Sequence, residues 1–249
     1  FLSKNLELEK IKGGSSDSFG LRTQFEKSII RIAFKGCGDP SKLSLKKIRQ
    51  VGGEYANMAN AHKSETVRVE IPYHETKDFS YALALQAFLE GVYLANYQFN
   101  KYRDPKDAKP NTLKNVEIIT SSISKSEAND IFQKVSIIGE SIYLARDLIN
   151  EPAIQLTPTE FAKQAQKLAK ETKISCKVLG EDECKKLNMG LFLGVSKGSK
   201  EEAKLIHLTY KPAKQSKKKK RVITLLGKGL TFDSGGLSLK PADAMMDMK

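Results

Sequence analysis

The sequence predicts an α/β protein: a smaller amino-terminal α/β domain, a long connecting helix, and the start of a second α/β domain with a mostly parallel central sheet. Three observations support this prediction. Strand-like and helix-like segments alternate, one helical pattern is far longer than the others, and a glycine-rich loop follows an apolar run near the end. We expect the amino-terminal domain over residues 1–125, the connecting helix over 126–150 and the second domain over 151–249.

In the first half of the chain the clearest patterns are strand, helix and strand. Residues 66–72 alternate apolar and polar side chains, which is typical of a half-exposed strand. Residues 79–99 carry apolar side chains at helical spacing and predict a long helix, and residues 116–120 predict the next strand. Residues 1–60 show fewer patterns, although a strand is expected over 29–34, between glycine-rich turns.

The longest helical pattern runs from about residue 126 to residue 149. Its apolar side chains recur every three or four positions and form one stripe, which consists of Ala128, Ile131, Phe132, Val135, Ile138, Ile142 and Leu148. We interpret this helix as the connector between the two domains.

The second domain begins with a well-marked helix. Thr157 is a predicted N-cap, Pro158 fits the first helical position and Glu160 completes a capping box, so we expect a helix to about residue 172. A strand, a short helix and a second strand are then expected, at residues 174–179, 181–187 and 205–210. This order of elements favours a mostly parallel sheet.

A glycine-rich loop at residues 227–241 groups one acid with two amines. Residues 222–226, directly before it, have the continuous apolar character of a strand buried on both faces. An aspartate such as Asp233 can bridge two divalent cations, and a lysine can bind a cation only as a neutral amine. A lysine that stays protonated can instead stabilise charge on a carbonyl oxygen. The spacing does not fit a phosphate-binding P-loop, and a purely structural polar loop is the alternative.

The spacing of these charged residues resembles that of a known family. Lys228 and Asp233 are five positions apart, and Lys240 follows seven positions later. Further segments that share the resemblance are residues 90–99, 145–153, 156–158 and 190–199. In order and spacing they are similar to the leucyl aminopeptidases, the two-metal cytosolic exopeptidases of the M17 type, over about residues 80–249.

The resemblance implies a peptidase that releases amino-terminal residues from peptides, with a leucine-type preference, by means of a metal-activated water. It implies two divalent cations per subunit, Mn²⁺ or Zn²⁺, with Lys228 as a ligand of one and Asp233 as a ligand shared by both. Lys240 would face the scissile carbonyl oxygen, and Met248 would line the pocket for the first side chain of the substrate. Peptide substrates, a homo-hexamer and a cytoplasmic location are implied as well.

The resemblance also implies residues that this sequence does not contain. Further metal-binding carboxylates and an anion-binding arginine are expected beyond Lys249, and Asp243 and Asp247 lie too close to Asp233 to replace them. The sequence begins with Phe1 rather than Met. We therefore expect a fragment that lacks the carboxyl-terminal half and the extreme amino terminus, and that is inactive alone.

The net charge of +13 suggests a second hypothesis from another class. Its densest block, residues 217–221, could contact phosphates, which favours a nucleic-acid-binding relative whose catalysis is lost or secondary. The competing interpretation is a solvated turn between two strands.

Other features of the composition narrow the class of protein. No apolar run approaches the roughly 18 residues that a membrane span needs, so no membrane partner is expected. The three cysteines are scattered, which suits a reducing compartment, and the three histidines share no metal-binding spacing.

Overall fold

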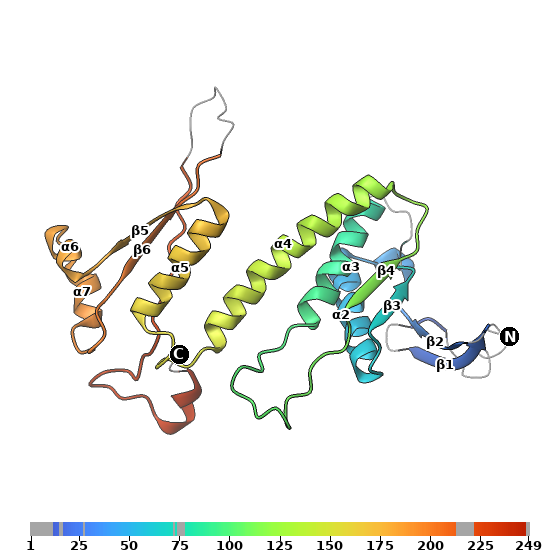
Figure 1. Ribbon diagram of the computed structural model, residues 1–249, viewed down its shortest axis with the longest axis horizontal. Coiled ribbons are helices and arrows are strands. Elements are labelled where there is room, and N and C mark those ends of the chain that lie inside the picture. Colours follow the sequence, from blue (N-terminus) through green and yellow to red (C-terminus); the bar gives the residue numbers. More distant parts are fainter. Residues whose placement is uncertain are drawn as a thin grey trace. The chain divides into compact units, whose positions relative to one another are not determined.

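The structure, a computed structural model, describes residues 12–14, 17–26, 28–71, 73, 78–212 and 222–247. It contains two compact units, Phe1–Ala145 and Arg146–Lys249, and each combines helices with a small amount of sheet (Figure 1). The predicted α/β class is therefore confirmed.

The described residues of the first unit form two small sheets and three main helices, the last of which continues along the chain past Ala145. In chain order its elements are β1 (Ser18–Phe25), β2 (Ser28–Lys35), η1 (Pro40–Lys42), α2 (Leu45–Ala61), β3 (Thr66–Val69), α3 (Tyr81–Ala95), β4 (Asn115–Ile118) and α4 (Lys125–Asn150). β1 and β2 form an antiparallel hairpin, whereas β3 and β4 pair in parallel, with Val67 opposite Val116. The strands predicted at 29–34, 66–72 and 116–120 are confirmed as β2, β3 and β4, although β3 and β4 are shorter than the patterns.

The helix α2 was not predicted from the sequence, although its start carries a clear signal. The side chain of Ser44 accepts a hydrogen bond from the Lys47 amide at 3.3 Å, and Ile48 and Val51 are fully buried. Two consecutive glycines, Gly52 and Gly53, lie in the middle of this helix. Because each glycine costs about 1 kcal/mol relative to alanine inside a helix, the pair obscures the pattern.

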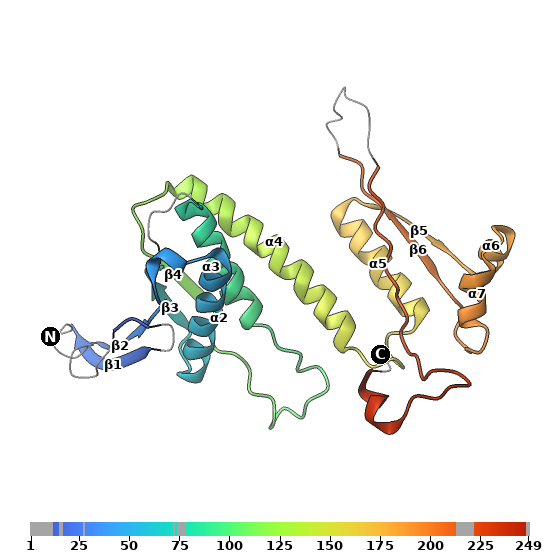
Figure 2. The ribbon, with the colours of Figure 1, turned by 180° about the vertical axis from the view of Figure 1, so that it is seen from behind.

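Figures 1 and 2 show α2 and α3 side by side in the first unit. Their apolar faces supply much of the buried core, including Ile48, Val51, Ala56, Leu85 and Phe88. An ion pair crosses the same interface, because the guanidinium of Arg49 donates to one carboxylate oxygen of Glu90 at 2.6 and 2.9 Å. The predicted helix at 79–99 is confirmed as α3 with shorter ends.

Side-chain amides hold the segment between α3 and β4 in place. The carbonyl oxygen of the Asn60 side chain accepts hydrogen bonds from the backbone amides of Thr112 and Leu113, at 2.8 and 3.0 Å. The amide nitrogen of Asn60 donates to Asn96, whose own side chain donates to the Leu113 carbonyl. One side chain of α2 thus satisfies two backbone groups that have no partner in a helix or strand.

Replacing Asn60 by alanine should therefore reduce the free energy of unfolding by about 2 kcal/mol, since two part-buried amides lose their acceptor. Urea denaturation followed by tyrosine fluorescence would measure this loss. Asn100→Ala is the matched control, because the half-buried Asn100 side chain makes one hydrogen bond, at the exposed surface, to the side chain of Gln98. Its effect should stay within about 0.5 kcal/mol, and an equal loss in both variants would contradict the prediction.

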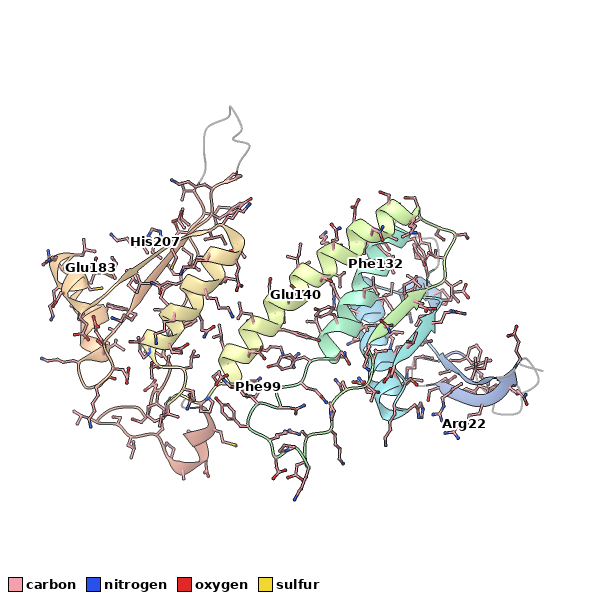
Figure 3. All side chains as sticks on the ribbon, in the orientation of Figure 1. Arg22, Phe99, Phe132, Glu140, Glu183 and His207 are labelled. Atoms are coloured by element: carbon pink, nitrogen blue, oxygen red, sulfur yellow. The ribbon has the colours of Figure 1, made fainter. Side chains whose placement is uncertain are left out.

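The helix predicted at 126–149 is confirmed as α4, Lys125–Asn150. Its middle contacts α3, where Gly139 makes room for the ring of Tyr93 and the hydroxyl of Tyr143 donates to the Tyr93 carbonyl oxygen. The predicted apolar stripe is only partly buried, because Ile131 is buried whereas Phe132 is 38% exposed. Figure 3 labels Phe132 on this helix.

In the part of the second unit that the structure describes there are three α-helices, a strand pair and a short 3₁₀ helix. Its elements are α5 (Pro158–Thr172), β5 (Ser175–Leu179), α6 (Glu181–Lys186), α7 (Gly190–Ser196), β6 (Leu205–Thr209) and η2 (Ala242–Asp247). The N-cap prediction for α5 is confirmed, because the Thr157 hydroxyl accepts from the Glu160 amide at 3.3 Å and Pro158 begins the helix. β5 and β6 pair antiparallel, which differs from the mostly parallel sheet expected for the second domain. Among the described strands, the parallel pair is β3 and β4 of the first unit.

The strand expected over residues 222–226 is not formed, and this prediction was wrong. The segment is irregular, and Val222, Ile223, Leu225 and Leu226 are 85–96% exposed. A strand buried on both faces needs hydrogen-bonded neighbours, and none of the described residues pairs with this segment.

Among the residues described, no helix combines the length and the apolar character that crossing a membrane requires.

Candidate metal and catalytic loop

Asp233 and Lys240, predicted from the sequence to act together, are brought into contact by a tight loop. One carboxylate oxygen of Asp233 accepts a hydrogen bond from the Gly235 amide at 2.9 Å. The other lies 3.6 Å from the Nζ atom of Lys240. The amide of Lys240 donates to the Ser234 carbonyl at 2.8 Å, which closes the loop on itself.

The charges around Asp233 favour its ionised form. The pKa of this carboxyl group is lowered by the hydrogen bond from the Gly235 amide, then by the positive charge of Lys240, and to a smaller degree by Lys228. The carboxylate therefore keeps its charge at neutral pH and can accept a cation. Its side chain is 45% exposed and that of Lys240 is 28% exposed, so the pair lies open to an incoming ligand.

Lys228 lies on the exposed part of the same segment, before the closed loop. It is near enough to Asp233 to lower the pKa of that group. Next to it, Gly229 is in contact with Phe161 of α5: a Cβ atom at this glycine would lie 3.1 Å from the Phe161 ring. Sequence reasoning missed this contact, because nothing in the pattern of α5 points to the loop.

Lys228 and Asp233 supply two donors for divalent cations, an amine and a carboxylate. These donors fit such a site chemically, because a carboxylate binds hard cations through oxygen and a neutral amine can act as a ligand. They are too few to form a closed site, and the described residues contain no cluster of three or more histidine, cysteine, aspartate or glutamate side chains suited to a metal. The Nε2 atom of His207, a residue of β6 labelled in Figure 3, lies 3.3 Å from the Thr209 hydroxyl. His62 is the C-cap of α2.

Two predicted features fall outside the described residues. Met248, expected to line the substrate pocket, is one of them, and the basic block at 217–221 is the other.

Two cavities of the described residues lie away from this loop. One of about 420 Å³ is bordered by α3, β4 and α4, with Tyr93, Asn96 and Phe132 in its wall. Another, of about 480 Å³, lies over the β1–β2 hairpin and includes Arg22 and His62. Both belong to the first unit, so the charged loop is identified by its side chains and not by a hollow surface.

Comparison with known proteins identifies the family. Residues 1–106 match the N-terminal domain of the cytosol aminopeptidase family, and residues 143–249 match its catalytic domain. A "Probable cytosol aminopeptidase" of Rippkaea orientalis is 36% identical over 88% of this chain, and one of Trichodesmium erythraeum is 34% identical over 99% of it. The chain covers 43% and 48% of those proteins, and so spans about half the length of the curated relatives it matches.

Solved structures agree with this match. A mutant of tomato leucine aminopeptidase aligns with a TM-score of 0.79 and 28% identity, over 94% of this chain and 45% of that one. The bottromycin maturation enzyme BotP, in complex with Mn, aligns with a TM-score of 0.80 and 25% identity, over 98% of this chain and 49% of that one. With both domain models matched in order, the chain belongs to the cytosol aminopeptidase family.

Proposed function

We propose that this chain is the amino-terminal part of a two-metal aminopeptidase that releases amino-terminal residues, with a leucine-type preference, from peptides. The observation that carries the proposal is the contact between Asp233 and Lys240, an acid and an amine 3.6 Å apart on one closed loop. Both residues lie in the segment that matches the catalytic domain of a peptidase family, which supports a catalytic role for this contact.

Each charged residue of the loop has a role in this proposal. The ionised carboxylate of Asp233 holds the cations, and Lys228 adds its amine as a further ligand. The two cations, Mn²⁺ or Zn²⁺, would supply the Lewis acidity that activates a water for attack on the scissile carbonyl. The ammonium of Lys240 donates to the oxygen of that carbonyl as negative charge develops on it.

Several parts of the proposal rest on similarity. The Mn bound by BotP supports a divalent metal in this protein too. The names of the curated relatives support a location in the cytosol and favour a peptidase over the nucleic-acid-binding alternative. Assembly into a hexamer, the division at residues 125 and 150 and a role of Met248 in the substrate pocket are proposed on the same ground.

The test is a peptidase assay on the full-length protein. Leucine amide should be cleaved, chelation with 1,10-phenanthroline should abolish the activity, and Mn²⁺ or Zn²⁺ should restore it. N-acetyl-leucine amide is the control substrate, because it lacks the free amino group that an aminopeptidase requires. Activity that survives chelation, or equal cleavage of both substrates, would refute the proposal.

A further inference from the structure

The loop from Asp233 to Lys240 turns at a residue that only glycine suits. Gly235 has a φ of +98°, in the region that L-residues rarely adopt. A Cβ atom built on it would lie 2.2 Å from the Ser238 carbonyl oxygen and 3.1 Å from the Lys240 amide nitrogen. Both neighbours are backbone atoms, so no side-chain rotation can relieve the collision.

The next residue, Gly236, provides a comparison within the same turn. Its φ is +68°, also in the left-handed region, but a Cβ atom there would have nothing within 4 Å. The two glycines therefore share an unusual backbone conformation and differ in their surroundings. Of the two, only Gly235 faces the backbone of the residues that close the loop, Ser238 and Lys240.

The contacts of Gly235 connect it to both charged residues. Its amide holds one oxygen of the Asp233 carboxylate at 2.9 Å. Its α-carbon faces the backbone of Ser238 and Lys240, where the Lys240 amide closes the loop onto the Ser234 carbonyl at 2.8 Å. Opening the loop at this point would release the carboxylate and move the ammonium away from it.

We propose that Gly235 is a positioning residue, which sets the Asp233 carboxylate and the Lys240 ammonium face to face. Its role in catalysis rests on the proposed function; its role in the geometry does not. In the family mechanism one of these groups would hold cations and the other would face the substrate, so a single displaced turn should weaken metal binding and slow turnover together.

The experiment compares Gly235→Ala with Gly236→Ala in the full-length protein. For Gly235→Ala we expect Mn²⁺ affinity, measured by electron paramagnetic resonance, to fall by about tenfold or more. kcat should fall by about tenfold or more even at saturating Mn²⁺, because added metal restores the cations but not the position of Lys240. Gly236→Ala carries the same kind of backbone strain at its positive φ but adds no collision, so it should stay within about threefold of the wild type in both measurements.

Hydrogen exchange at the Lys240 amide tests the geometry without reference to any activity. This amide should be protected in the wild type and in Gly236→Ala, and it should exchange faster in Gly235→Ala. Equal exchange in the three proteins, or equal Mn²⁺ affinity and kcat in the two variants, overturns the positioning role. If the wild-type protein itself binds no Mn²⁺ and cleaves no peptide, while the Lys240 amide still exchanges faster in Gly235→Ala, the proposed function is refuted and the geometric role is retained.

Discussion

Replacing Lys240 by glutamine in the full-length protein is expected to lower kcat by about 100- to 1,000-fold while metal content stays near the wild-type level. The ammonium is the group proposed to face the carbonyl oxygen, and removing a donor that acts on developing charge affects the transition state more than the substrate. KM should therefore change little. Steady-state kinetics together with metal analysis of the purified protein would measure both effects.

Asp233→Asn separates the two roles in the loop. This change keeps the size of the side chain but removes the negative charge, so metal should be lost together with activity. Lys197→Gln, at the exposed lysine that follows α7, is the control for loss of one positive charge in the same unit. A kcat of Lys240→Gln within threefold of the control's would refute the role proposed for Lys240. An Asp233→Asn enzyme that retains its metal would refute the role proposed for Asp233.

Local signals were enough to predict several elements. α4 was predicted because its apolar positions repeat over about six turns, and α5 because Thr157 and Pro158 mark its start. The charged loop was predicted because Asp233, Lys240 and the glycines between them are close in sequence. A contact formed over seven residues requires only local turn geometry, which glycine makes available.

Features that depend on distant contacts could not be predicted in the same way. Residues 222–226 have strand-forming side chains, but a strand also needs partners, and those are set by the rest of the fold. The reverse holds for α2, where Gly52 is unfavourable for an isolated helix and is required by the helix packed against it. The contact of Phe161 with Gly229 likewise joins residues far apart in the chain, and no local sequence pattern predicts it.

The close approach of α2 and α3 leads to the second prediction of large effect. A Cβ atom at Gly91 of α3 would lie 1.9 Å from the Arg49 carbonyl oxygen, and one at Gly52 of α2 would lie 2.1 Å from the Phe88 carbonyl oxygen. Because neither glycine has a Cβ atom, each allows the backbone of the other helix to approach closely. Around this crossing lie fully buried side chains, Ile48 and Phe88 among them, which would lose contact if the helices moved apart.

Gly91→Ala should thus lower the free energy of unfolding by about 3 kcal/mol, even though alanine favours a helix over glycine by about 1 kcal/mol. Urea denaturation followed by tyrosine fluorescence would report the loss, since the chain has eight tyrosines and no tryptophan. Gly53→Ala is the matched control one position from Gly52. Its Cβ atom would lie 3.4 Å from that of Ala95, an ordinary contact, so the helical preference of alanine should prevail.

The double variant Gly52→Ala/Gly91→Ala tests whether both glycines serve the same crossing. Once either new methyl group has pushed the helices apart, the second meets a wider gap, so the combined loss should be clearly smaller than the sum of the single losses. Additive losses would show that the glycines act at independent sites. A stable Gly91→Ala protein would show that the backbones need not approach so closely, and the reason for two glycines in α2 would have to be sought elsewhere.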